Sequence, residues 1–195
     1  MNQEKVWDGV AEEWAKFRTR PVDEVVEFLD GKVGRVLDLG CGSGRNFIDN
    51  KGLDIYGVDF SGKLLEIAKS KGYVELKKGT TDEIPYGDDF FDWVVFVRVL
   101  HCVDSAEKRK KSIGEVYRVL KKNGEAVIST IGWKNQRIKN KPKECIIPWT
   151  VGDVKYERYN YTYDKDEFEG LLKSVGFEVV FLEEGKNIVA VVRKG

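Results

Sequence analysis

The sequence predicts an α/β fold of the doubly wound type, with a mostly parallel seven-stranded sheet whose last strand is antiparallel. Short β-branched runs alternate with helical patterns, which is typical of a parallel sheet covered by helices on both faces. The run at 93–97 is apolar throughout, as in a central strand buried on both sides. The turn at 184–186 is short enough to make the closing pair antiparallel. The expected strands lie at 35–39, 54–59, 73–78, 93–98, 125–130, 178–183 and 187–192.

Helical patterns separate these strands. Apolar residues recur there at the 3.6-residue period of a helix, and Gly31, Gly72 and Gly176 follow helix ends. Residues 1–30 are expected to form an N-terminal helical cap on a single domain that spans 1–195. The expected helical stretches lie at 6–16, 22–29, 64–68, 113–120 and 168–175.

The stretch 130–154 fits neither the helix period nor the strand period. It is rich in lysine and arginine between residues 134 and 143 and has no acid there. We interpret it as an inserted loop or lid, followed at 155–163 by a segment whose tyrosines either contact a substrate or pack at a sheet edge. Together, residues 131–163 are predicted to be an inserted segment on the substrate side of the domain.

Composition excludes several classes of function. Lys plus Arg and Asp plus Glu both number 33, so no global basic field indicates a nucleic-acid partner. Three separated cysteines and a single histidine predict neither a disulfide framework nor a metal site. The polar start and the lack of a long apolar run predict a cytoplasmic protein without a signal peptide or membrane span. A charged fraction of 34% with glutamine only at positions 3 and 136 favours a thermophilic source.

A glycine-rich loop follows the first expected strand and is expected to lead into a helix. Gly40, Gly42 and Gly44 allow a tight turn and let a ligand lie against bare backbone. Asp59 ends the second strand, 19 residues after Gly40, where a carboxylate can accept both hydroxyls of a ribose. The loop and the acid together predict a site for a nucleotide-like ligand, although a purely structural loop is the alternative.

The spacing of the loop separates two kinds of nucleotide ligand. A dinucleotide motif has its third glycine where this chain has Arg45, and its pyrophosphate needs a helix N-terminus. Asp38, just before the loop, would repel a phosphate. An acid at that position suits the ammonium and sulfonium charges of S-adenosylmethionine, which carries no phosphate. The expected cofactor is therefore S-adenosylmethionine.

Four segments carry a resemblance to class I methyltransferases, which have a Rossmann-like fold. Residues 36–44 resemble their motif I, 56–61 their motif II and 90–96 their motif IV, and 113–121 resembles the helix before the fifth strand. The resemblance implies an adenine pocket near Phe60 and the loop 79–86. The acid usual after the third strand is Thr80 here, so Asp82 or a backbone amide near Thr81 is expected to contact the adenine instead.

Four short patterns extend the resemblance to the methyltransferases that esterify the carboxymethyl group of wobble uridine in tRNA. The likeness runs from about residue 6 to residue 192 and departs from the family pattern at Cys102, Asn160 and Tyr161. It implies tRNA as the acceptor, and a small zinc-binding activator protein that pairs with several such enzymes along a sheet edge. The matching patterns are Thr19-Arg20, Val99-Leu100-His101, Pro148-Trp149 and Arg158-Tyr159.

The resemblance assigns candidate residues to two sites. The candidate catalytic residues are Arg98, His101, Arg158 and Tyr159. The candidate cofactor-binding residues are Arg20, Asp38, Gly40, Gly42, Gly44, Asp59, Phe60, Thr81, Asp82 and Arg98, and no metal ligands are expected.

A carboxylate acceptor is ionised at neutral pH and needs cations to position it rather than a strong base. Arginines are suited to that task because a guanidinium holds a carboxylate or phosphate bidentately, and Arg18, Arg20, Arg98 and Arg158 are the candidates. The basic stretch 134–143 either holds an RNA backbone or is a solvated loop. His101 is a base or, more simply, a hydrogen-bonded residue at a helix start. Two other functions stay open: a small-molecule methyltransferase and a non-catalytic binding module.

Overall fold

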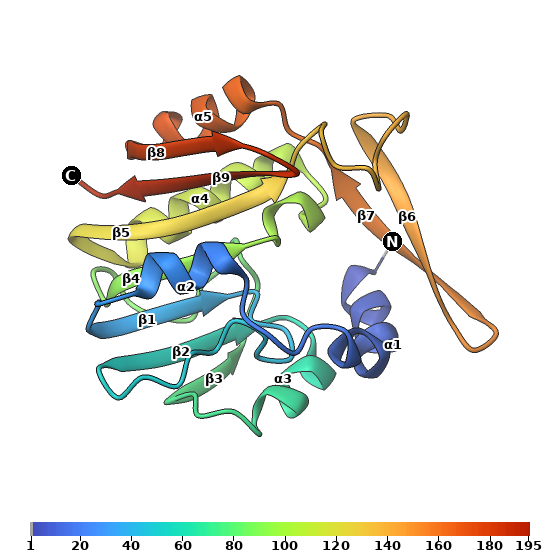
Figure 1. The fold of residues 1–195 in the computed structure, drawn as a ribbon, viewed down its shortest axis with the longest axis horizontal. Helices are drawn as coiled ribbons and strands as arrows, with labels where there is room; N and C mark the ends of the chain where they lie inside the picture. The colour runs from blue at the N-terminus through green and yellow to red at the C-terminus, as the bar shows by residue number, and fades with distance from the viewer. Residues whose placement is uncertain (1) are drawn as a thin grey trace.

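The computed structural model describes residues 2–195, and its centre is a seven-stranded sheet of order β3-β2-β1-β4-β5-β9-β8 (Figure 1). Strand β9 runs antiparallel to both β5 and β8, while the other pairings in this sheet are parallel. The predicted doubly wound sheet with an antiparallel last strand is confirmed. The strands are β1 Gly34–Leu39, β2 Leu53–Asp59, β3 Glu75–Lys78, β4 Phe91–Val97, β5 Leu120–Ile131, β6 Glu144–Val151, β7 Val154–Tyr161, β8 Glu178–Glu184 and β9 Asn187–Arg193.

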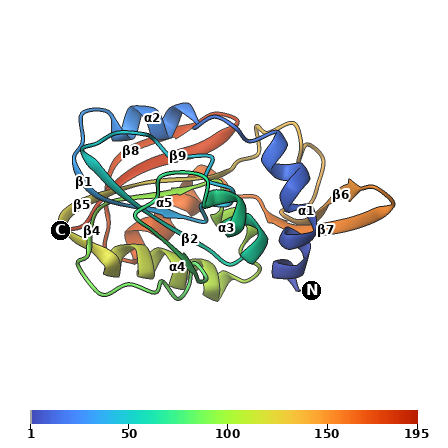
Figure 2. The ribbon, with the colours of Figure 1, turned by 90° about the horizontal axis from the view of Figure 1, so that it is seen from below.

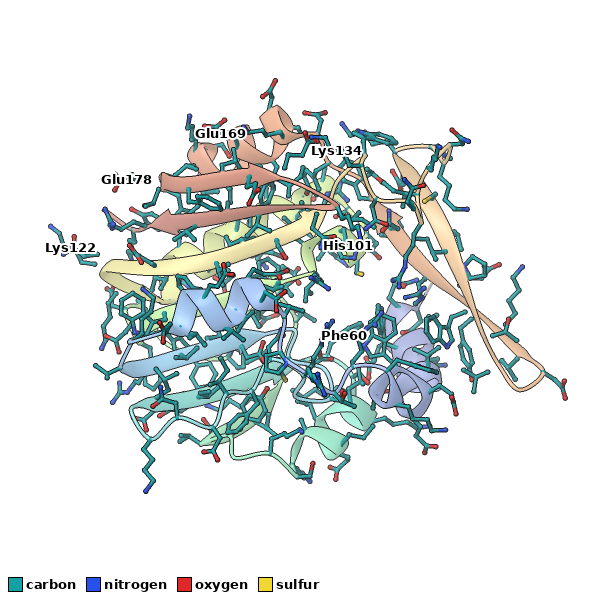
Figure 3. All side chains as sticks on the ribbon, in the orientation of Figure 1. Phe60, His101, Lys122, Lys134, Glu169 and Glu178 are labelled. Carbon is teal, nitrogen blue, oxygen red and sulfur yellow. The ribbon has the colours of Figure 1, made fainter. Side chains whose placement is uncertain are left out.

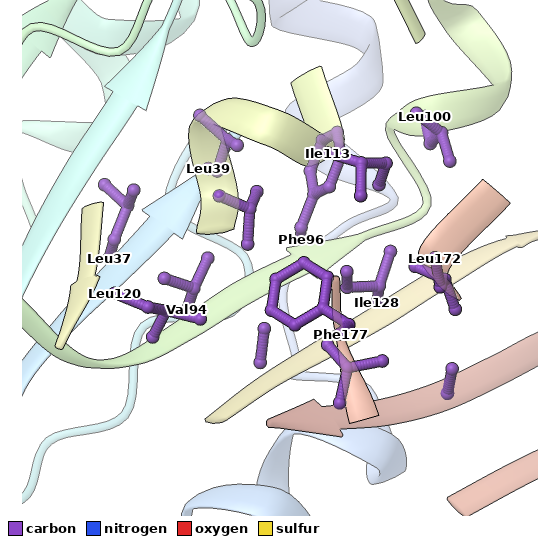
Figure 4. Close-up of a cluster of buried hydrophobic side chains, with 14 of the residues drawn as sticks. Leu37, Leu39, Val94, Phe96, Leu100, Ile113, Leu120, Ile128, Leu172 and Phe177 are labelled. Atoms are coloured by element: carbon purple, nitrogen blue, oxygen red, sulfur yellow. The ribbon is translucent and has the colours of Figure 1, made fainter. Parts of the chain in front are cut away.

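Helices cover both faces of the sheet, with α2 on one face and α4 on the other (Figure 2). Neighbouring residues of a central strand therefore enter opposite cores. In β4, Val94 and Phe96 join the larger cluster with α4 and α5, part of which Figure 4 shows, whereas Val95 and Val97 pack with α2. This is why residues 93–97 show no polar alternation. The helices are α1 Gln3–Lys16, α2 Asp23–Leu29, α3 Gly62–Ala68, α4 Ala106–Val119 and α5 Lys165–Ser174, with a 3₁₀ turn η1 at Leu100–Cys102.

The N-terminal region divides into two parts with different places in the fold. Helix α1 contacts α3 and the strands β6 and β7, beside the end of the sheet at which β1, β2 and β4 terminate (Figure 1). Helix α2 instead buries Val25, Phe28 and Leu29 against the sheet itself. The predicted cap over residues 1–30 is thus limited to α1, because the apolar stripe of α2 belongs to the core of the main sheet.

The inserted segment is more regular than the sequence indicates. Strands β6 and β7 form a separate antiparallel hairpin that projects from the main sheet (Figure 1). The prediction of a loop over 130–154 is therefore wrong for residues 144–151, which form β6. The segment that begins at 155 belongs to β7 and is not an edge strand of the main sheet. Burial alternates along β6, but the alternating residues are only half-buried, so the pattern in the sequence is weak.

The crossover from β1 to β2 departs from the expectation of a helix after the glycine loop. Residues 45–52, eight in all, form turns and irregular backbone instead. The whole connection between β1 and β2, residues 40–52, is close to the shortest length of about a dozen residues for a parallel crossover, and the glycine loop takes up its first part, which leaves little room for a helix. The glycine loop therefore offers no helix N-terminus to a phosphate, which argues against the dinucleotide alternative.

None of the helices among residues 2–195 is both long enough and apolar enough to cross a membrane.

Candidate active site

The glycine loop at the end of β1 has a backbone that other residues adopt only with strain. Gly40, Gly42 and Gly44 have φ values of +71°, +55° and +79°. A Cβ atom on Gly40 would lie 2.5 Å from Val99 and one on Gly44 would lie 2.8 Å from Lys71, so both positions need glycine for packing as well. A Cβ on Gly42 would meet nothing within 4 Å. Gly42 thus turns bare backbone toward open space, which is what a cofactor lying on this loop requires.

Asp59 stands directly beside that open position. Its Oδ2 accepts a hydrogen bond from the Gly42 amide at 2.9 Å, and its Oδ1 accepts one from the Ser61 amide at 2.9 Å. Burial raises the pKa of this carboxyl to about 6, against the lowering effect of those amides. The Phe60 amide is a third donor to this carboxylate, which has about four acceptor sites, so at least one site remains for a ribose hydroxyl.

Asp38 is a second buried acid beneath the loop. Its Oδ2 accepts a hydrogen bond from the Tyr73 hydroxyl at 2.7 Å, and burial raises its pKa to about 7, with the charge of Asp59 adding to the rise. No cation is among the groups that shift the pKa of either acid. A ligand with positive charges would supply the missing counter-charge. These residues therefore fit S-adenosylmethionine, whose sulfonium supplies an electrophilic methyl group.

The expected adenine side of the site is formed by half-buried residues. Phe60 directly follows β2, and Figure 3 labels it at the same end of the sheet as His101. The Thr81 hydroxyl lies 2.7 Å from the Ser112 hydroxyl of α4, so its side chain is occupied and its backbone amide is what remains for a ligand. Asp82 is half-buried in the same loop.

Helix α1 reaches this site through Asp8. Asp8 accepts hydrogen bonds from the Ser61 hydroxyl and, at 3.2 Å, from the Lys63 amide. Ser61 in turn caps α3, and its amide binds Asp59. Helix α1 is thereby fixed to the residue that follows Phe60, at the edge of the expected adenine pocket.

Arg158 of strand β7 lies between α1 and the neighbouring strand β6. Its guanidinium carbon lies 5.7 Å from the ring centroid of Trp7, 5.3 Å from Trp14 and 5.0 Å from Trp149. Trp7 and Trp14 are seven residues apart and so share one face of α1. The Arg158 Nε atom is buried without a hydrogen-bond partner among the described residues. A guanidinium held by aromatic faces keeps its charge while its donors stay free for an anion.

His101 lies close to this guanidinium. Burial lowers its pKa to about 4, and the charges of Arg158 and Arg98 lower it further. Its Nδ1 atom is buried and has no hydrogen-bond partner in the described part of the chain. The imidazole is therefore neutral at neutral pH, and its Nδ1 atom has hydrogen-bonding capacity that the described residues do not use. Burial also raises the pKa of the neighbouring Cys102 thiol to about 12, so this thiol stays protonated.

Arg98 has the partner that its position at the end of a buried strand requires. Its Nε and Nη2 atoms donate to Glu24 Oε1 at 3.1 Å and 3.0 Å. Its φ of +61° is unusual for a residue with a side chain, and such strain is often found at functional sites. Arg20, by contrast, has an exposed side chain, and its carbonyl oxygen accepts a hydrogen bond from Arg45.

Tyr159 does not join the other candidate catalytic residues. It is 9% exposed, and its hydroxyl accepts a hydrogen bond from Arg109 at 3.1 Å. Successive residues of a strand point to opposite faces, so Arg158 and Tyr159 cannot both face α1. The structure thus brings Arg158, His101 and Arg98 together and places Tyr159 in a packing role.

Reasoning from the sequence missed two residues of this site. Trp14 and Gly9 are not distinguished by any motif. The seven-residue spacing of Trp7 and Trp14 is the one signal that identifies a shared helix face. Gly9 acts only through its contact with the distant Tyr156.

Gly9 makes the approach of α1 to the hairpin possible. A Cβ atom at this position would lie 2.0 Å from the Tyr156 ring. We expect Gly9→Ala to lower the free energy of unfolding by about 1–3 kcal/mol through overpacking. The change should also slow methyl transfer, because it would open the cage that Trp7, Trp14 and Trp149 form around Arg158. Chemical denaturation measures the first effect. The control is Gly114→Ala in α4, where a Cβ meets nothing within 4 Å and which we expect to stabilise by up to about 1 kcal/mol. Equal effects of the two changes would contradict this packing argument.

The strand order, the antiparallel β9 and the glycine loop beside Asp59 define the class I methyltransferase fold. Solved structures of methyltransferases have the same fold. A methyltransferase of Thermotoga maritima superposes with a TM-score of 0.74 at 24% identity, covering 98% of this chain and 99% of that one. A methyltransferase in complex with the Haloferax volcanii Trm112 activator gives a TM-score of 0.71 at 14% identity, covering 99% and 98%.

Residues 37–128 match the family model described as a methyltransferase domain. The tRNA (carboxymethyluridine(34)-5-O)-methyltransferase of Schizosaccharomyces pombe is 26% identical over 93% of this chain and 90% of its own length. The Arabidopsis thaliana protein of the same name is 30% identical over 78% of this chain, which spans only 37% of that protein. The chain is an S-adenosylmethionine-dependent methyltransferase.

Proposed function

We propose that the acceptor is a carboxylate on a tRNA nucleoside, the carboxymethyl group of wobble uridine, and that the product is its methyl ester. The observation that carries this proposal is the caged guanidinium of Arg158. It is half-buried, it has no carboxylate partner among residues 2–195, and it lies beside the neutral His101. A charge in such a place is stabilised by an anionic ligand, and a planar guanidinium matches a carboxylate in two parallel hydrogen bonds.

The chemistry needs no strong base. A carboxylate is ionised at neutral pH and is itself the nucleophile. Bound S-adenosylmethionine would supply the methyl group, whose bond to sulfur would break as the bond to the carboxylate oxygen forms, leaving neutral S-adenosylhomocysteine. The protein therefore contributes mainly alignment. In the proposed mechanism Arg158 binds the carboxylate, and Arg98, fixed by Glu24, adds positive charge at the end of β4. His101 donates or accepts a hydrogen bond at the acceptor base without changing its charge.

Two further observations favour RNA over a free small acid. The relatives from Schizosaccharomyces pombe and Arabidopsis thaliana are named for this reaction on tRNA. The stretch 134–143, five of whose residues are Lys or Arg, lies at the same end of the sheet, where Figure 3 labels Lys134. Part of its charge is used inside the protein, because Lys134 forms an ion pair with Glu184 at 3.0 Å and Lys143 one with Glu167 at 2.7 Å.

The test is methyl transfer to bulk tRNA with a cofactor labelled in its methyl group. We expect label in the RNA that mild alkali releases, since an ester is hydrolysed where a methylated base or ribose is not. Unmodified tRNA transcripts, which lack the carboxymethyl group, are the control and should take up no label. Alkali-resistant label would overturn the ester. Transfer to small carboxylic acids but not to tRNA would replace the proposal by a small-molecule methyltransferase.

We also propose a partner and a setting. The structural neighbour solved with the Trm112 activator supports an activator protein as the partner. That this partner is small, binds zinc and pairs along a sheet edge is what the resemblance to the wobble-uridine methyltransferases implies. Strand β3, which has four residues and ends the sheet, is one such edge. The setting that we propose is the cytoplasm, and the relatives named for a reaction on tRNA support it. Networks of ion pairs such as Arg193 with Glu125 and Glu178 support the thermophilic source that composition favours.

A further inference from the structure

The connection between α1 and α2, residues 17–22, gathers guanidinium groups from distant parts of the chain. Arg18 lies over the Trp14 ring at 4.5 Å, the same ring that Arg158 contacts at 5.3 Å. Arg45, directly after the glycine loop, donates from Nε to the Arg20 carbonyl at 2.9 Å. The connection therefore lies between the cofactor loop and the acceptor cage.

Two more arginines complete this cluster. Arg98 is fixed by Glu24 in the first turn of α2, just after the connection. Arg137 comes from the loop after β5. Burial lowers the pKa of Arg18, and the charges of Arg137 and Arg98 lower it further. Burial likewise lowers the pKa of Arg158, with Arg137 and Arg18 contributing. In a chain of zero net charge, Glu24 is the one carboxylate that pairs with this group within residues 2–195.

An exposed aromatic ring adjoins the same arginines. Phe17 is 65% exposed, although it follows a helix whose other aromatic residues are packed. Exposed aromatic rings beside arginines are typical of surfaces that bind single-stranded nucleic acid, where a base stacks on the ring and guanidinium groups hold the phosphates. Within residues 2–195 this ring takes part in none of the aromatic pairs or cation–π contacts of its neighbours Trp7 and Trp14.

We propose that Phe17, Arg18, Arg45 and Arg137, which we name the connection surface, bind the RNA strand beside the acceptor nucleotide. The arginines hold backbone phosphates and Phe17 stacks on a neighbouring base. The proposal rests on the proposed function, because it assigns the flanking nucleotides of the same substrate. It differs in chemistry from the acceptor cage: Arg158 binds the reacting carboxylate, whereas the connection surface binds groups that do not react.

The test is binding of a fluorescent single-stranded oligouridylate of about ten nucleotides, followed by polarisation and without any turnover. We expect Phe17→Ala to weaken binding by about tenfold, the effect of losing one stacked base. Arg18→Gln and Arg137→Gln should each weaken binding and lower the slope of log affinity against log salt by about 0.7, the value for one phosphate contact on a single strand.

Two matched controls test whether the effect is local. Phe181→Ala removes a ring that is 48% exposed on the edge strand β8. Arg35→Gln removes an arginine that lies 4.5 Å over the Phe90 ring, as Arg18 does over Trp14, but at the opposite end of the sheet. Both controls should bind the oligonucleotide like the wild type.

Three outcomes would overturn the inference. One is wild-type affinity in all three surface variants, and another is an equal loss in the controls. The third concerns free uridine monophosphate as the probe. If the arginine variants lose as much affinity for it as for the oligonucleotide, and Phe17→Ala binds both like the wild type, the surface binds a small phosphorylated ligand instead of RNA. Failure of the proposed function is separate, because alkali-resistant or absent label on tRNA leaves the binding result intact.

Discussion

Replacing Arg158 with glutamine is expected to lower kcat/KM for the acceptor by about 100-fold and to leave cofactor affinity within about twofold of the wild type. The reason is that the caged guanidinium binds the reacting carboxylate and lies apart from Gly42 and Asp59, which face the cofactor. Losing one partner of a desolvated charge pair costs about 2–5 kcal/mol, which corresponds to a change of that size. Steady-state kinetics and calorimetry with S-adenosylmethionine measure the two quantities.

A second substitution separates charge from geometry at this position. Arg158→Lys keeps the cation but loses the planar fork, so its activity should lie between those of the wild type and the glutamine variant. Arg35→Gln, at the far end of the sheet, is the control and should not change turnover. Unchanged turnover in Arg158→Gln would remove Arg158 from the acceptor site and with it the main support for a carboxylate acceptor.

Replacing Asp38 with asparagine is expected to stabilise the protein without cofactor and to weaken cofactor binding. The pKa of Asp38 is about 7 in the folded chain and near 4 when unfolded, so the folded state retains a proton that the unfolded state releases as pH rises between these values. Folding stability from this group is thus present below pH 4 and lost as pH rises through 7. Asparagine stays neutral and keeps an acceptor for Tyr73. The gain should be on the order of 2–4 kcal/mol above pH 7 and vanish near pH 4.

Denaturant titrations over this pH range measure the gain, and calorimetry measures the cost to binding. We expect S-adenosylmethionine to bind Asp38→Asn about tenfold more weakly. The affinity for S-adenosylhomocysteine, which lacks the sulfonium charge, should fall by less in this variant. A stability difference between variant and wild type that does not depend on pH over this range would show that folding does not raise the pKa of Asp38.

Features that depend on neighbouring residues were predicted from the sequence, and features that depend on distant ones were not. The strands β1, β2 and β4 and the glycine loop follow from local apolar runs and from glycine spacing, and Asp59 follows from its position at a strand end. The class of cofactor follows from the same short segments. Burial on both faces of a strand leaves a signal in the sequence because each residue of it must be apolar.

The acceptor side was harder to predict because its residues come together only in the folded chain. The cage joins Trp7 and Trp14 of α1 to Trp149 of β6, and Arg98 pairs with Glu24, which is 74 residues away. Strand β6 is weakly patterned because its burial alternates only between exposed and half-buried. The role expected of Tyr159 came from the resemblance of the pair Arg158-Tyr159 to a family pattern, although neighbouring strand residues point to opposite faces.

Helix α1 makes contacts in both halves of the site: Asp8 binds Ser61 beside Asp59, and Trp7 and Trp14 hold Arg158. When the cofactor or the acceptor binds, it restricts the motion of this helix, and the loss of conformational entropy is then smaller when the second ligand binds. We therefore expect positive and reciprocal cooperativity between cofactor and acceptor, in which each raises the affinity of the other by the same factor.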